Sequence, residues 1–110
     1  MNWMSATFKD FERLDIRVAK LVSVENMPGM KKLMKAKVDL GDRIANAVLG
    51  GAEYYKPNDL EGKTVAAIAN MEPKTVAGVE SECMLLAADD HGKPIWITFP
   101  DNLPPGTKIR

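Results

Sequence analysis

Lysines gather in one short segment of the chain. Four of the seven residues at positions 31–37 are lysines, and no acidic residue interrupts them. They are Lys31, Lys32, Lys35 and Lys37. Ammonium groups at this spacing suit a phosphate backbone, because each neutralised phosphate releases a condensed counterion. Lysines also keep the edge of a β-sheet from pairing with other chains. Taken alone, the segment favours such a solvated strand face over a phosphate contact, and both interpretations stay open.

A second polar segment, Asn70–Lys74, follows a predicted buried strand. Asn70 carries an amide that could hydrogen-bond the edge of a nucleobase, and Lys74 carries an ammonium group for a phosphate. By itself the segment predicts only a turn. Few aromatic residues lie near these lysines in the sequence, so we expect little base stacking of the kind that single-strand binders use.

Residue patterns for catalysis are sparse. His91, the one histidine, lies in a predicted turn, where a solvated side chain is a simpler interpretation than a general base. Cys83 lies in an apolar strand and is interpreted as a small buried side chain. Glu80 and Glu82 suit a solvated face better than an acid–base pair. We therefore expect no enzyme, no metal site and no cofactor. A hydrolase or isomerase built on Glu80, Glu82 and His91 is the minor alternative.

The composition limits the class of protein. We expect one folded domain spanning residues 1–110, since the chain has 110 residues and is 45% hydrophobic. A single cysteine excludes an internal disulfide framework and suits a reducing compartment, so we expect a cytoplasmic protein. No apolar run approaches the ~20 residues of a membrane helix. The 15 Lys and Arg residues balance 15 Asp and Glu residues, which argues against coating nucleic acid by charge alone. Positive charge nevertheless gathers in residues 31–37 and at Lys74.

Hydrophobic residues recur mostly with a period of two, which predicts strands. In the first strand the apolar face is expected to hold residues of one parity, with Lys20 as a misfit. In the second strand, Lys35 and Lys37 fall on the face opposite the apolar residues. Gly41 and Asp42 predict a hairpin turn between the second and third strands. The predicted strands are Leu14–Val24, Leu33–Leu40, Arg43–Leu49, Thr64–Ala69, Cys83–Ala88 and Pro94–Phe99.

Helical signals are short. The Thr7 hydroxyl precedes Asp10 by three residues and predicts a capped turn or two of helix. A second helical turn is predicted to begin at Pro57 and to end before Gly62. Short strands with Gly and Pro turns and little helix predict an all-β fold, closed into a small barrel that leaves no exposed edge. An OB-fold five-stranded barrel with short flanking helices and a C-terminal β extension fits the length.

Three segments together resemble the tRNA-binding-domain family. Phe11–Val18 is similar to the family's opening, in which an acidic-aromatic turn precedes a D-[IL]-R-V strand. Asn70–Lys74 and then Gly78–Ala87 resemble its N-x-x-P-x…G-x-x-S-x-x-M-x-L block. Pro104–Ile109 is similar to its P-x-G-[ST]-x-[IV] ending. The similarity runs from about residue 8 to residue 110.

This resemblance implies an OB barrel, usually homodimeric, that grips tRNA largely by shape and backbone. The family supplies stand-alone tRNA-binding proteins, the C-terminal domain of many bacterial methionyl-tRNA synthetases, and a separate archaeal chain labelled the synthetase beta subunit. It therefore implies a non-catalytic tRNA-binding module that assists methionyl-tRNA synthetase in trans. Carried over by position, Lys32 would meet phosphate, Ser81 would offer a hydroxyl and Met84 a soft apolar contact. The expected RNA-binding residues are Lys31, Lys32, Lys35, Lys37, Asn70, Lys74, Ser81 and Met84.

Two further expectations follow from the resemblance. The family also includes export-associated chaperones that bind unfolded peptide on the same scaffold, so a peptide-binding chaperone is the alternative function. Apolar side chains near the start of the chain predict a partner surface, which the family's homodimer would supply. These side chains are Met1, Trp3, Met4 and Phe8. Trp3 and Trp96 are attributed to core or dimer packing.

Overall fold

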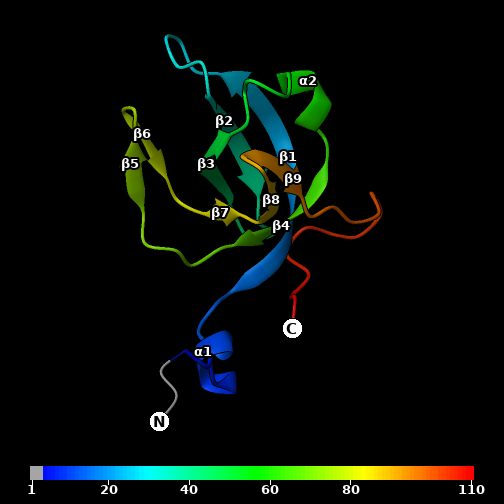
Figure 1. The fold of residues 1–110 in the computed structure, drawn as a ribbon. Coiled ribbons are helices and arrows are strands. Elements are labelled where there is room, and N and C mark those ends of the chain that lie inside the picture. The colour runs from blue at the N-terminus through cyan, green and yellow to red at the C-terminus, as the bar shows by residue number, and fades with distance from the viewer. Residues whose placement is uncertain (1–3) are drawn as a thin grey trace.

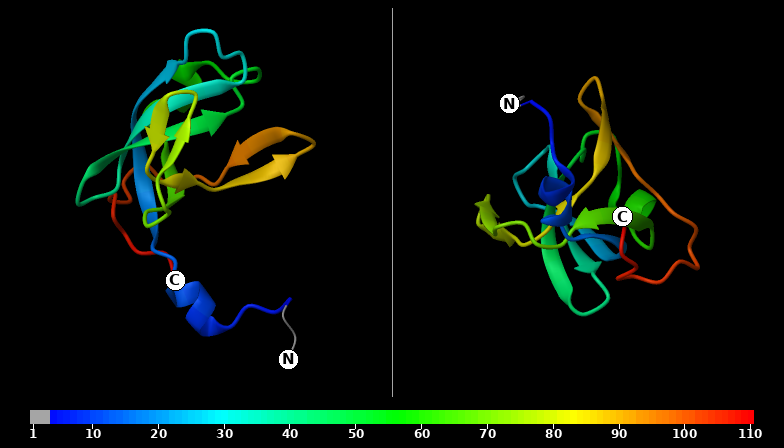
Figure 2. Two further views of the ribbon diagram at one scale, coloured as in Figure 1. Left: turned by 90° about the vertical axis from the view of Figure 1, so that its left-hand side faces the viewer. Right: turned by 90° about the horizontal axis from the view of Figure 1, so that it is seen from below.

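A computed structural model describes residues 4–110, so Met1 and Trp3 lie outside the described residues. Five antiparallel strands form one sheet in the order β3-β2-β1-β4-β7, which curls into a nearly closed barrel (Figures 1 and 2). Two hairpins, β5–β6 and β8–β9, project from it (Figure 2). The elements are α1 (Phe8–Glu12), β1 (Ile16–Asn26), β2 (Leu33–Asp39), β3 (Ile44–Gly50), α2 (Pro57–Leu60), β4 (Thr64–Ile68), β5 (Lys74–Val76), β6 (Val79–Ser81), β7 (Met84–Leu85), β8 (Ala87–Asp90) and β9 (Lys93–Trp96). The predicted all-β OB-type barrel is confirmed.

Side chains close the last seam of the barrel, between β3 and the segment that leads into β7. The Glu82 amide donates to the Asn46 carbonyl (2.8 Å), and the Asn46 amide donates to a Glu82 carboxylate oxygen (2.9 Å). The Val48 amide donates to the Ser81 hydroxyl (3.1 Å). Edge amides of β3 that would otherwise be unpaired are thereby satisfied without a full ladder.

A bulge changes which residues of β1 face the core. The pairing with β2 shifts between Leu21 and Ser23, leaving Val22 as the extra residue. Val22 is 47% exposed, whereas Leu21 is fully buried. The prediction that Val22 shares the apolar face of Val18 and Val24 was therefore wrong, because Val22 occupies the bulge. The alternation also changes earlier, where Val18 and Ala19 are both buried, and Lys20 then points outward.

The core fills the barrel with small and medium aliphatic side chains. Alanines on β3 and β4 are buried with almost no exposure, which lets the strands approach closely. Leu21, Met34 and Leu40 are among the largest fully buried side chains, and each contributes about 1.5–3 kcal/mol by leaving water. This core holds the outward-facing residues of β2 and β3 on a rigid surface.

Both predicted helical turns are present. In α1 the Asp10 amide donates to the Thr7 hydroxyl (3.2 Å), and the Thr7 amide donates back to the Asp10 carboxylate (2.9 Å). The Lys56 amide donates to the carboxylate of Asp59 (2.8 Å) at the start of α2. α1 lies beyond one end of the barrel (Figure 1) and buries none of its residues; Phe8 is 73% exposed. Within residues 4–110, neither helix is long and apolar enough to cross a membrane.

Two parts of the strand prediction need correction. Residues 74–81, for which no strand was predicted, form the β5–β6 hairpin, whose turn places Ala77 and Gly78 at positive φ. The single strand predicted over Cys83–Ala88 is divided into β7 and β8 at Leu86. Leu86 donates to Ala66 of β4 (3.0 Å) and accepts from Ile97 (3.2 Å), so the chain switches partners at this residue.

The C-terminal segment supplies the expected β extension. It lies along the first residues of β1, where β2 has not yet begun to pair. Two backbone hydrogen bonds join them: the Val18 amide donates to the Thr107 carbonyl (2.8 Å), and the Gly106 amide donates to the Val18 carbonyl (2.7 Å). The contact with the β2–β3 turn is tight, because a Cβ on Gly41 would lie 2.7 Å from the Cα of Gly106.

Candidate functional site

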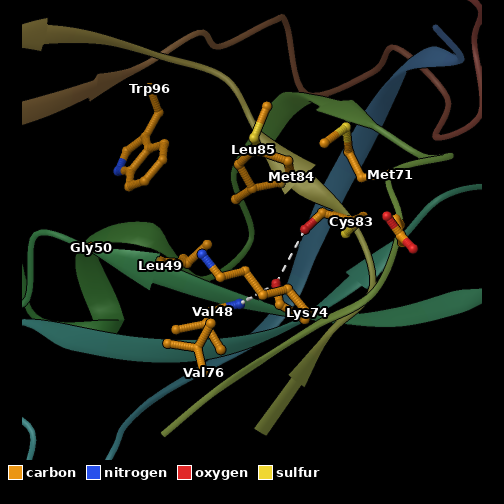
Figure 3. A pocket seen from close by; sticks show the side chains of 12 residues that line it. Val48, Leu49, Gly50, Met71, Lys74, Val76, Cys83, Met84, Leu85 and Trp96 are labelled. Carbon is orange, nitrogen blue, oxygen red and sulfur yellow. Dashed lines mark hydrogen bonds between the residues drawn. The ribbon is translucent and has the colours of Figure 1, made fainter.

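A cleft of about 300 Å³ lies between β3, the β5–β6 hairpin, β7 and β9 (Figure 3). Apolar side chains form most of its wall, and they include Val48, Met71, Met84 and Trp96. The charged residues in its lining are Lys74 and Glu72. Such a wall suits a flat or apolar group, and the ammonium group adds attraction for an anion.

Three of the predicted RNA-binding residues meet at this cleft. Lys74 is exposed, and its side chain extends over the cleft in Figure 3. Met84 is 43% exposed. Ser81 is only part-exposed, and its hydroxyl accepts from the Val48 amide (3.1 Å) and donates to the Cys83 carbonyl (3.3 Å). Ser81 therefore holds the hairpin against β3 and shapes the cleft.

The lysines of β2 lie on the outer face of the sheet, as predicted. Lys35 and Lys37 line a hollow of about 90 Å³ together with Val79 of β6, so this hollow and the cleft share the β5–β6 hairpin as a wall. Lys35 forms a 3.0 Å ion pair with Glu25, its partner across β1 and β2. Both side chains are largely exposed, so water and salt weaken this pair. Within the described residues, Lys37 has no ion pair.

Lys31 and Lys32 are exposed in the loop that precedes β2. The Lys32 carbonyl accepts from the Ala52 amide (3.3 Å), which ties this loop to the segment between β3 and α2. The register pairs Leu33 with Gly50, so these lysines lie at the end of β3 that contributes Gly50 to the cleft.

Asn70 points away from these residues. Its amide nitrogen donates to the Arg13 carbonyl (2.8 Å), and its oxygen accepts from the Asp15 amide (2.8 Å). The Ala69 amide donates to the Asp15 carbonyl (2.7 Å) at the same place. The Asn70 side chain thus joins the end of β4 to the chain between α1 and β1, and the structure does not bring it to the cleft.

An ionic network that sequence reasoning missed lies beside this junction. Arg17 contacts Asp15 and Asp42, each at 2.7 Å, and donates to the Leu40 carbonyl (3.0 Å). Lys108 of the C-terminal segment contacts Asp15 at 3.1 Å. Hydrogen bonding from Arg17 lowers the pKa of Asp15 to about 2, against the opposing effect of burial, and Lys108 adds to the lowering. The hydrogen bond with Asp15 in turn raises the pKa of Arg17. The hydrogen bond from Arg17 lowers the pKa of Asp42. The sequence signal for this network was the spacing of Asp15 and Arg17, an acid and an arginine two residues apart in the first predicted strand.

The residues of the catalytic alternative lie on separate elements. Glu80 is exposed on β6, whereas the Glu82 carboxylate accepts from the Asn46 amide (2.9 Å). The His91 side chain is 99% exposed in the β8–β9 turn. Burial raises the pKa of the Cys83 thiol to about 11, which disfavours a thiolate. No group of three His, Cys, Asp or Glu residues within positions 4–110 is placed to hold a metal ion.

The family described as "Putative tRNA binding domain" matches residues 16–108. The chain belongs to the tRNA-binding domain family. The methionine–tRNA ligase of Clostridium tetani is 43% identical over 106 residues, which cover 94% of this chain and 16% of the ligase. That of Pyrococcus horikoshii is 46% identical over 104 residues, covering 94% of this chain and 14% of the ligase. The chain thus spans 14% to 16% of the length of these relatives.

Two solved structures match almost the whole chain. A MetRS-related protein from Pyrococcus horikoshii superposes with a TM-score of 0.91 and 32% identity, covering 96% of this chain and 98% of that one. The chaperone CsaA from Bacillus anthracis gives a TM-score of 0.85 and 30% identity, covering 96% and 99%. Proteins with two different descriptions thus share this barrel, so the fold alone does not select the ligand.

Proposed function

We propose that the chain is a non-catalytic module that grips tRNA by its shape and by contacts with its phosphates. The observation that carries the proposal is a set of lysines without an ion pair in residues 4–110, on a barrel of a tRNA-binding family. The elements that carry them are the 27–32 loop, β2 and β5, which face the viewer in the left view of Figure 2. These lysines are Lys31, Lys32, Lys37 and Lys74.

Each predicted residue has a different part in this proposal. Lys37 of β2 and Lys74, the first residue of β5, bind phosphates on the two sides of the β5–β6 hairpin. Met84 offers an apolar contact in the cleft. Lys35 contributes less, because Glu25 partly offsets its charge. Ser81 acts by holding the hairpin in place.

Structured RNA suits this surface better than duplex DNA. The longer helix in residues 4–110 has five residues and lies beyond the end of the barrel, so the fold offers no recognition helix for a major groove. Loops and short hairpins follow an irregular backbone more readily. A ligand recognised by shape and phosphates is therefore the better match.

We further propose that the module assists a methionyl-tRNA synthetase in trans, raising its affinity for tRNA while the partner chain performs aminoacylation. The methionine–tRNA ligases to which it is similar extend far beyond the matched region, which is consistent with a separate catalytic part. A cytoplasmic location and one domain over residues 1–110 belong to the same proposal. The free, buried thiol of Cys83 is compatible with a reducing compartment.

Self-association is part of the proposal. A hollow of about 310 Å³ lies between α1 and the C-terminal residues, and Phe8, Phe11, Leu14 and Ile109 contribute to it. Phe11 and Leu14 are each 37% exposed, which leaves an apolar surface that a second copy would cover. A two-fold homodimer would also double the lysines available to one tRNA.

Titration with unfractionated tRNA at several salt concentrations tests the main proposal. Affinity should fall as salt rises, and each lost phosphate contact should reduce the slope of log K against log salt by about 0.9. Lys37→Ala and Lys74→Ala should each show this reduction. Lys35→Ala is a matched control from the same strand face as Lys37, and it should change the slope less. Salt-independent binding, or none tighter than about 100 μM near 50 mM salt, would refute the proposal, since phosphate contacts must be salt-linked.

A peptide-binding chaperone is the second candidate, and the apolar wall of the cleft favours it. Met71 and Met84 have adaptable thioether side chains, which suit varied apolar partners. The discriminating measurement is suppression of client aggregation, with peptide and tRNA added separately as competitors. Suppression that peptide reverses and tRNA does not would favour the chaperone.

A further inference from the structure

Two tyrosines and a lysine form a cluster next to, but outside, the cleft. The Nζ atom of Lys93 lies 6.0 Å from the ring centroid of Tyr54 and 5.6 Å from that of Tyr55. Tyr54 is 48% exposed. We refer to Tyr54, Tyr55 and Lys93 as the tyrosine–lysine cluster. Lys93 begins β9, and the tyrosines lie between β3 and α2, so the fold joins two distant segments; the hydrogen bond from Tyr55 to Pro94 spans 39 residues.

The cluster is held in place by several contacts. The amides of Tyr54 and Tyr55 both donate to the Gly51 carbonyl (2.9 and 3.0 Å), and the Tyr55 hydroxyl donates to the Pro94 carbonyl (2.7 Å). Gly51 has a φ of +92°, and a Cβ there would lie 2.7 Å from the Pro94 Cγ. The turn and β9 are therefore packed closely, which holds the backbone that carries Tyr54 in place.

The charge of Lys93 is still available to a ligand. No carboxylate of residues 4–110 lies within ion-pair distance of its ammonium group. A cation–π contact restrains the ammonium group without neutralising it. Lys32 is tied to the same turn through the Ala52 amide (3.3 Å), and Lys56 directly follows the tyrosines. The nearest acids in the chain and in the register are Glu53 of the turn and Asp90, which pairs with Lys93 across β8 and β9; neither forms an ion pair with Lys93, and Asp90 contacts His91 instead.

We propose that the tyrosine–lysine cluster is a second RNA contact, at which an unpaired nucleotide stacks its base on Tyr54 and places its phosphate at Lys93. This inference rests on the proposed function and extends it from phosphate contacts to a stacking contact. Exposed aromatic rings beside cations are how proteins bind unpaired nucleotides with little sequence preference, because every base has a π-face. The sequence-based expectation of weak stacking considered residues 31–37 and Lys74, whereas the fold brings the two tyrosines to a different lysine, Lys93.

The test compares variants in titrations with unfractionated tRNA at several salt concentrations. Tyr54→Ala should weaken binding by about 5- to 20-fold with an unchanged salt slope, because stacking involves no counterion. Tyr54→Phe keeps the ring and should bind within about twofold of the original protein. Tyr54→Leu keeps apolar packing without a flat π-face and should resemble Tyr54→Ala. Lys93→Ala should reduce the slope by about 0.9, whereas Lys20→Ala, an exposed lysine of β1, should have a smaller effect.

The outcomes separate this inference from the proposed function. If the original protein binds no tRNA at any salt concentration, the proposed function fails. If Lys37→Ala or Lys74→Ala weakens binding while the Tyr54 and Lys93 variants bind normally, the cluster inference alone is overturned. Normal binding by Tyr54→Leu beside weak binding by Tyr54→Ala would also overturn it, since an apolar contact would then suffice. Unfolding midpoints of the variants, measured alongside, exclude a loss of folded protein.

Discussion

Replacing Asn70 with alanine removes two hydrogen bonds that join the end of β4 to the chain before β1. These bonds connect the Asn70 side chain to the Arg13 carbonyl and the Asp15 amide, both at 2.8 Å. A hydrogen bond contributes about 0.5–1.5 kcal/mol net, and the lower half applies here because water can reach this exposed site. We expect Asn70→Ala to lower the free energy of unfolding by about 1–2 kcal/mol.

Urea denaturation at a fixed protein concentration measures this loss, since self-association would make stability depend on concentration. Asn70→Asp keeps the acceptor for the Asp15 amide but places a carboxylate oxygen against the Arg13 carbonyl, so it should lose at least as much as Asn70→Ala. Asn102→Ala, at an exposed position in the C-terminal segment, should stay within about 0.5 kcal/mol of the original protein. tRNA affinity of the folded Asn70→Ala protein should change little. Unchanged stability with a large loss of affinity would refute the reasoning and support the RNA contact expected from the motif.

Three other properties should follow from the contacts described. Because the pKa of Asp15 is lowered to about 2 from an ordinary 3.8, its contribution to stability is complete above pH 3.8 and is lost as pH falls toward 2. That contribution is about 1–2 kcal/mol once partial exposure is allowed for, and Asp15→Asn should abolish it in acid titrations of stability. Cys83, buried and with a pKa raised to about 11, should react with iodoacetamide at pH 8 much more slowly in the folded protein than in urea; equal rates would contradict its burial. Gly41→Ala should lower the free energy of unfolding by about 1–3 kcal/mol, because φ is +95° and the Cβ would meet Gly106; a neutral effect in urea denaturation would contradict this close approach.

The barrel could be predicted because its strands have a strong alternation and clear turn residues. β2 shows this best, since Met34 is buried while Lys37 projects outward, as the period of two requires. The bulge at Val22 could not be predicted, because an apolar residue at that position fits either face. The β5–β6 hairpin was not predicted, because its three-residue strands are mostly exposed and lack a buried apolar stripe.

The candidate site shows a different limit. Residue type identified Lys74 and Met84, which line the cleft, but it could not tell which way Asn70 and Ser81 point. An amide or hydroxyl can bind a ligand or the protein's own backbone, and only the tertiary arrangement decides between them. The tyrosine–lysine cluster had no sequence signal, since its members approach each other only after β9 folds against the turn that follows β3.

A neutral chain can still present a positive surface, because many of its carboxylates bind other groups of the protein, whereas several lysines have no ion pair within residues 4–110. Several carboxylates bind the chain's own backbone amides or arginine: Asp10 and Asp59 at the helix starts, Glu82 at the barrel seam and Asp15 beside Arg17. Charges interact strongly only within a Debye length of about 8–10 Å at moderate salt. A phosphate at the β5–β6 hairpin therefore responds mainly to Lys37, Lys74 and the nearby acids Glu72 and Glu80, and little to the acids beside α1 and α2. The zero net charge then limits non-specific attraction at long range, which favours a protein that binds and releases a folded RNA.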